Sequence, residues 1–124
     1  MSPSRILIVE DEPEIAVNLC ALLSAKGHRA TAVHDGASAL ARVRKDAFDL
    51  ILLDVMLPSM SGFDVCKLLR AEPRTATIKI IMVTGLDRMA DVEEAFRAGA
   101  DDYLIKPIDS ERLYRKIDKV LAAS

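Results

Sequence analysis

The sequence predicts an α/β domain in which helices cover both faces of a parallel, five-stranded sheet. Five short apolar runs alternate with five amphipathic stretches, which is the pattern of repeated strand–helix–strand units joined by right-handed crossovers. Most of the apolar runs are nearly continuous, as in strands that are buried on both faces. The chain has 124 residues, 51% of them hydrophobic, enough for one compact core.

The first three strands and the first two helices follow in order. Ile6 to Val9 is a continuous apolar run, and a predicted helix from Glu12 to Lys26 follows it, with apolar residues at helical spacing. Gly27 stands where that helix would stop. A half-polar run then suits a strand at the sheet edge, and the most apolar run suits a buried central strand. The second strand, second helix and third strand are predicted at 29–33, 36–45 and 50–53.

The second half of the chain repeats this alternation. A loop that holds Pro58 and Gly62 leads into the third helix, and Gly99 stands where the fourth helix would stop. No linker or internal repeat interrupts the pattern, so residues 1–124 are expected to form a single domain. The remaining elements are predicted as a helix at 63–71, a strand at 78–83, a helix at 88–98, a strand at 103–105 and a helix at 110–122.

Composition narrows the classes of partner. A net charge of -2 argues against nucleic acid or an anionic membrane as the main partner. No apolar run approaches the roughly 20 residues needed to span a bilayer, and the N-terminus offers no signal peptide. We therefore expect a cytoplasmic protein. Cys20 and Cys66 fall in helical patterns and are expected to be reduced thiols in or near the core.

Polar residues end four of the five predicted strands. Glu10 and Asp11 follow the first strand, Asp54 follows the third, Thr84 ends the fourth and Lys106 follows the fifth. In a parallel sheet these positions meet at one edge, where ligands bind. Gathered carboxylates repel one another unless a cation lies among them, and Mg2+ prefers such oxygen ligands. Singly, each residue has an ordinary structural explanation, such as a helix cap or a solvated lysine, and their joint order carries the prediction.

This set of residues suits phosphoryl transfer. Asp54, at the end of the most apolar strand, would be the nucleophile, and a metal ion would hold its carboxylate against a phosphoryl oxygen. Lys106 could neutralise a second phosphoryl oxygen and Thr84 could donate a hydrogen bond to a third. The backbone N–H of Gly85 could approach the group closely because glycine has no side chain.

The sequence resembles response-regulator receiver domains of two-component signal transduction over essentially its whole length. That resemblance implies the flavodoxin-like (βα)5 fold with strand order 2-1-3-4-5. The motifs that carry it are Ile-Leu-Ile-Val-Glu-Asp-Glu at 6–12, Asp-Leu-Ile-Leu-Leu-Asp-Val-Met-Leu-Pro at 49–58, Met-Ser-Gly-Phe-Asp at 60–64, Val-Thr-Gly at 83–85 and Gly-Ala-Asp-Asp-Tyr-Leu-Ile-Lys-Pro at 99–107.

The resemblance assigns metal and acceptor roles. It implies that Asp54 accepts a phosphoryl group from a histidine kinase or a histidine phosphotransfer protein, in a Mg2+-dependent reaction. Asp11 and Asp54 would ligate Mg2+ directly, together with the backbone carbonyl of Met56. Glu10 stands where the family more often has Asp, and would act on the metal through water.

It also assigns a switch. Thr84 and Lys106 would bind the phosphoryl group, and Tyr103 would be the switch aromatic that turns inward when Thr84 moves. The Lys106–Pro107 peptide would be cis, a form taken by about 5–6% of X-Pro bonds in general. Apart from its own phosphorylation and slow autodephosphorylation, the domain is not expected to be an enzyme.

The output surface would run from the fourth helix through the fifth strand to the fifth helix. Receivers that dimerise through this surface carry a set of charged residues on it. This chain has Arg97 where that set has Glu, and Asp118 where that set has Arg. Because these reversed charges disfavour the pairing, a monomer or a weak dimer is expected. The nature of the output, and whether the domain stands alone or belongs to a longer protein, stay open. A basic stripe on the last helix is read as a solvated face; it consists of Arg112, Arg115, Lys116 and Lys119.

Other protein classes with a similar fold or a similar phosphate chemistry fit this sequence less well. A flavodoxin needs a hydroxyl- and glycine-rich loop after the first strand, where this chain has acids. A haloacid-dehalogenase-type phosphatase expects a second Asp two residues after the nucleophile, where this chain has Met56. A kinase or NTPase needs a glycine-rich phosphate loop with lysine. A receiver that has lost phosphorylation would not be expected to keep the complete acidic, Thr and Lys set.

Overall fold

The computed structural model describes residues 3–123 and has the predicted parallel sheet. Its five strands lie in the order β2-β1-β3-β4-β5, which confirms the flavodoxin-like fold. The strands are β1 (Arg5–Val9), β2 (Arg29–Val33), β3 (Leu50–Leu53), β4 (Lys79–Thr84) and β5 (Asp102–Ile105). The helices are α1 (Pro13–Ser24), α2 (Gly36–Lys45), α3 (Gly62–Ala71), α4 (Met89–Ala98) and α5 (Ser110–Ala122).

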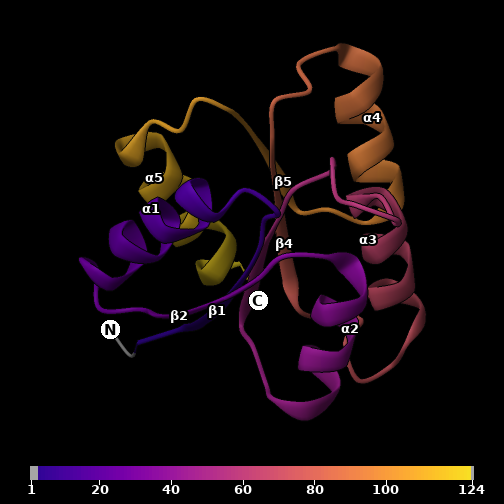
Figure 1. Ribbon diagram of the computed structural model, residues 1–124, viewed down its shortest axis with the longest axis horizontal. Helices are drawn as coiled ribbons and strands as arrows, with labels where there is room; N and C mark the ends of the chain where they lie inside the picture. The colour runs from indigo at the N-terminus through magenta and orange to yellow at the C-terminus, as the bar shows by residue number, and fades with distance from the viewer. Residues whose placement is uncertain (1–2, 124) are drawn as a thin grey trace.

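Two helical layers cover the sheet (Figure 1). Helices α1 and α5 lie on one face, and α2, α3 and α4 lie on the other. Alternate residues of β1 point to opposite cores: Ile6 and Ile8 pack with α1 and α5, whereas Leu7 and Val9 pack with the three-helix side. The central strand β3 is buried along its whole length, as its unbroken apolar run predicts.

Local sequence signals set where the elements begin and end. The helix α1 ends at Ser24, two residues before the predicted end, and the chain reaches the left-handed region at Gly27, where φ is 82°. Gly99 caps α4 in the same region, with φ at 112°. At the other ends, Asp35 caps α2 through a hydrogen bond from the Ser38 N–H, and Ser61 caps α3 in the same way.

Both cysteines are free thiols within the domain, as predicted. Cys66 is fully buried on α3, and burial raises the pKa of its thiol to about 11. Cys20, on α1, is half-buried, and burial raises its pKa as well. Within residues 3–123, no helix has both the length and the apolar character to cross a membrane.

Candidate functional site

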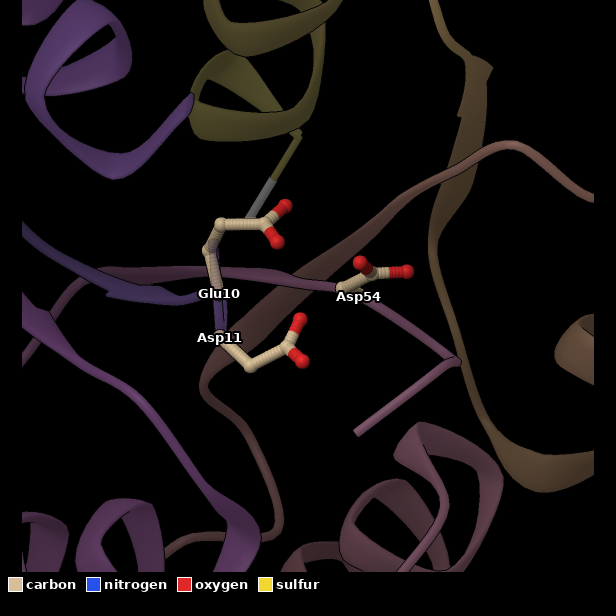
Figure 2. A group of neighbouring side chains, drawn as sticks. All are labelled: Glu10, Asp11 and Asp54. Carbon is tan, nitrogen blue, oxygen red and sulfur yellow. The ribbon is translucent and has the colours of Figure 1, made fainter. Parts of the chain in front are cut away.

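Three carboxylates meet at the carboxyl ends of β1 and β3. The sheet register pairs Val9 with Leu53, so the residues that follow each strand lie side by side. One oxygen each from Glu10, Asp11 and Asp54 lies within 4.8 Å of the others, and Figure 2 shows the three side chains around the same small space. Glu10 and Asp54 are only 2% and 5% exposed, whereas Asp11 is open to solvent.

Lys106 joins this group from the end of β5. Its Nζ donates to Oε1 of Glu10 at 2.6 Å and to Oδ2 of Asp54 at 2.9 Å. Burial opposes the charge of Lys106, but the hydrogen bonds to Glu10 and Asp54 outweigh it and raise the lysine pKa above its ordinary value. The ammonium therefore stays charged and holds two buried carboxylates together.

The second carboxylate oxygen of Glu10 and that of Asp54 each accept a hydrogen bond as well. Burial raises the pKa of Glu10, against the opposing effects of Lys106 and of the Glu12 N–H, which donates to Oε2 of Glu10 at 3.1 Å. The Met56 N–H donates to Oδ1 of Asp54 at 3.2 Å. Both buried carboxylates thus accept one backbone and one lysine hydrogen bond, which orients them toward the shared space.

The loop after β4 connects the site to Tyr103. Thr84 is completely buried at the end of β4, and its Oγ1 lies 3.5 Å from the N–H of Leu86. The hydroxyl of Tyr103 donates to the carbonyl oxygen of Leu86 at 2.7 Å. The ring of Tyr103 is buried in the core on the three-helix side, so in this structure the aromatic side chain points inward.

The burial of Tyr103 predicts how the free energy of unfolding depends on pH in the alkaline range. Burial, together with the charges of Asp91, Asp54 and Asp87, raises the pKa of Tyr103 from 10.0 to about 12. The folded protein then keeps a proton that the unfolded chain loses, so this contribution to the free energy of unfolding is complete below pH 10 and is lost between pH 10 and 12.

Urea unfolding of wild type and Tyr103→Phe across pH 9–12 should show this difference. The free energy of unfolding of wild type should fall more steeply above pH 10 than that of the variant. Tyr114→Phe is the control for the loss of a tyrosine hydroxyl. Equal slopes for wild type and Tyr103→Phe would show that Tyr103 ionises normally.

The structure also describes the other residues that were assigned to the site. The Lys106–Pro107 peptide is cis. Gly85 is exposed, and a Cβ built there meets no atom within 4 Å. Met56 is 62% exposed, and the metal-binding role of its carbonyl stays a prediction.

On α5, Lys116 departs from the expected solvated face, because its Nζ pairs with Asp102 at 2.9 Å.

Gly62 has a structural role that the sequence did not reveal. Its N–H donates to the Val55 carbonyl oxygen at 2.8 Å, which brings the start of α3 directly onto the backbone that carries Asp54. A Cβ at Gly62 would overlap the carbonyl oxygen of Asp54 and lie 2.8 Å from Cα of Val55. The sequence signal was a glycine in the loop after Asp54, but the backbone it would approach could not be identified.

We expect Gly62→Ala to lower the free energy of unfolding by about 2 kcal/mol or more, because backbone rather than a flexible side chain must move. Chemical denaturation measures the loss. Gly85→Ala is the matched control and should change stability little, because its added Cβ meets open space. Equal stability of the two variants would contradict the close approach at Gly62.

The residues present fit a divalent cation with a preference for oxygen. Two buried carboxylates and one exposed carboxylate, on two neighbouring strand ends, provide hard oxygen ligands and leave one side open to water. Mg2+ is commonly bound by one or two carboxylates while it keeps several waters. The same space adjoins the Lys106 ammonium, so a bound anion there would also meet the positive charge of this lysine.

The comparisons with known proteins agree with this geometry. The family model described as response regulator receiver domain matches residues 6–118. Over 118 residues the chain is 47% identical to Sensory transduction protein RegX3 of Mycolicibacterium smegmatis, covering 95% of this chain and 50% of that protein. It is 37% identical over 119 residues to Protein PilH of Pseudomonas aeruginosa, covering 96% and 98%. The chain thus spans about half the length of RegX3 and nearly all of PilH.

Solved structures show the same architecture. A response regulator from Chloroflexus aurantiacus has a TM-score of 0.94 and 33% identity, covering 98% of this chain and 99% of that chain. The receiver domain of the sensor histidine kinase PA1611 from Pseudomonas aeruginosa has a TM-score of 0.90 and 31% identity, covering 98% and 100%. That second structure holds a magnesium ion coordinated in its active site cleft.

Proposed function

We propose the following roles on the premise that this chain belongs to the response regulator receiver domain family, whose model matches most of its length. Asp54 is the acceptor of a phosphoryl group, and the surrounding residues hold that group and transmit its presence. The observation that carries the proposal is the buried Asp54 carboxylate, bonded to Lys106 and grouped with two further acids at the ends of parallel strands.

In the transfer step, an Asp54 carboxylate oxygen attacks phosphorus while the bond from phosphorus to the donor's histidine nitrogen breaks. The product is an aspartyl phosphate, and the donor regains a neutral imidazole after proton uptake. Asp11, Asp54 and the backbone carbonyl of Met56 would hold Mg2+ directly, and Glu10 would act through water. The ion would neutralise charge on the phosphoryl oxygens. Lys106 is already at hydrogen-bond distance from Asp54, so its ammonium needs little movement to follow the new charge.

The switch would pass from the phosphoryl group to the surface through the loop after β4. A phosphoryl oxygen that bonds Thr84, and the N–H of Gly85, would draw this loop toward Asp54. Leu86 would follow, and its carbonyl is the partner of the Tyr103 hydroxyl. The α4–β5–α5 surface would then repack as the output face.

Partners and activity follow from the same proposal. The donor is a histidine kinase or a histidine phosphotransfer protein, and the chain acts as an enzyme only on its own phosphoryl group. The output stays unnamed: relatives include one called a DNA-binding response regulator, MtrA, and one called PilH, which has nearly the length of this chain. The sign reversals at Arg97 and Asp118 support a monomer or a weak dimer. A cytoplasmic location is part of the same proposal.

Acetyl phosphate tests the chemistry without a partner protein. Intact mass spectrometry after incubation with acetyl phosphate and Mg2+ should show the gain of one phosphoryl group. The same incubation with EDTA should show none. An equal gain with EDTA would contradict the metal's role, and no gain in either, with the protein folded by circular dichroism, would contradict the acceptor function.

A further inference from the structure

The ring of His34 holds the peptide of Glu10 where the pairing of β1 with β2 stops. The ladder pairs Val9 with Val33, and the Glu10 N–H extends it by donating to the Val33 carbonyl oxygen at 3.0 Å. Nδ1 of His34 then lies 2.9 Å from the Glu10 carbonyl oxygen. Val33, the last residue of β2, and His34, the residue after it, therefore bind both backbone groups of Glu10.

A side chain here takes the place of a backbone donor. In a continuing parallel ladder, the N–H of Asp35 would be the next group to donate to the Glu10 carbonyl. Asp35 instead begins α2 as its N-cap and accepts a hydrogen bond from the Ser38 N–H at 2.7 Å. Because a carbonyl oxygen only accepts hydrogen bonds, Nδ1 of His34 must carry the proton.

This contact lies at the base of the acidic turn. Asp11 follows Glu10 directly, and α1 starts two residues later without a side-chain cap from Glu12. The direction in which the Asp11 carboxylate leaves the backbone depends on the peptide plane between Glu10 and Asp11. The His34 ring fixes that plane by its hydrogen bond to the Glu10 carbonyl oxygen.

We propose that His34 is a positioning residue for the acidic site: its Nδ1–H fixes the Glu10–Asp11 peptide and so orients the Glu10 and Asp11 carboxylates for the metal. The effect on the metal rests on the function proposed above, whereas the effect on the turn belongs to the metal-free protein. Within residues 3–123, the hydrogen bond found for the His34 side chain is the one to the Glu10 carbonyl, so His34 acts through Glu10.

The expected effects are moderate and selective. Loss of one neutral hydrogen bond corresponds to about a threefold to tenfold change in an equilibrium constant. In His34→Ala the Kd for Mg2+ should rise by about that factor. Amide exchange in metal-free protein should quicken similarly at Glu10 and Glu12, whose N–H groups donate to the Val33 carbonyl oxygen and to Oε2 of Glu10. The phosphorylation rate at saturating Mg2+ should stay within about twofold of wild type, because Asp54 and Lys106 keep their contacts.

Two conservative variants separate hydrogen bonding from general loss of the ring. The side-chain nitrogen of Asn can take the place of Nδ1, whereas that of Gln corresponds to Nε2. His34→Asn should therefore restore the wild-type exchange and Kd, and His34→Gln should resemble His34→Ala. His28→Ala is the control for loss of a histidine at the opposite end of β2, and should leave the turn unchanged.

The measurements are amide exchange by NMR in EDTA and Mg2+ titration by calorimetry. Unchanged exchange at Glu10 and Glu12 in His34→Ala would overturn the inference, as would a failure of His34→Asn to differ from His34→Ala. If wild type itself bound no Mg2+, the proposed function would fail, and the exchange in EDTA would still decide the role of His34.

Discussion

Asp54→Asn should take up no phosphoryl group from acetyl phosphate, while wild type gains one. The amide keeps the size of the carboxylate and fits the same buried place, but its oxygen is a far weaker nucleophile toward phosphorus. The Met56 N–H can still donate to the amide oxygen, so the loop after β3 should remain folded. Intact mass at saturating Mg2+ gives the result directly.

Asp64→Asn is the matched control for this variant. Asp64 is exposed in the first turn of α3 and has no place among the three grouped carboxylates, so that variant should be phosphorylated as wild type is. Phosphorylation of Asp54→Asn at the wild-type rate would show that another side chain is the natural acceptor.

Lys106→Met should lower both the stability and the phosphorylation rate, and added Mg2+ should restore only the stability. Without Mg2+, the buried carboxylates of Glu10 and Asp54 lose their shared ammonium, which should lower the free energy of unfolding by about 3 kcal/mol. Added Mg2+ should recover most of this loss, because a cation again lies among the acids and no ammonium competes for them. Phosphorylation at saturating Mg2+ should nevertheless slow by about 10²-fold, since one preorganised positive charge is missing from the transition state.

Denaturation with and without Mg2+, beside the rate of mass gain, measures both effects. Lys116→Met is the control, because it removes a lysine paired with one carboxylate, Asp102, outside the acidic group. Its stability should not depend on Mg2+ more than that of wild type does. If Lys106→Met lost no stability in EDTA, the contacts of Lys106 with Glu10 and Asp54 would not be energetically important.

Much of the fold and of the site's composition could be predicted from sequence, for a physical reason. Strands buried on both faces have continuous apolar runs, so their ends are sharp, and the residues that end parallel strands must meet at one edge. Asp54, Thr84 and Lys106 are found there because of this rule alone. The individual roles of the metal ligands, including the Met56 carbonyl, and the cis peptide needed the family resemblance in addition.

The remaining features depend on contacts between distant segments. The local sequence pattern does not predict three such contacts. These are the two hydrogen bonds of Lys106, the close approach of Gly62 to Asp54 and the hydrogen bond of the His34 ring to the Glu10 carbonyl. Likewise, the pattern of the last helix predicts a solvated basic face and does not reveal the ion pair of Lys116, because its partner Asp102 lies on a different element, β5.

Reductive trapping of the phosphorylated protein tests the central claim most directly. Borohydride converts an aspartyl phosphate to homoserine, which peptide mass mapping can place in the sequence. After incubation with acetyl phosphate, we expect homoserine at position 54 alone, and only when Mg2+ was present. Homoserine at position 11, or phosphate that survives borohydride on a serine or threonine, would contradict Asp54 as the acceptor.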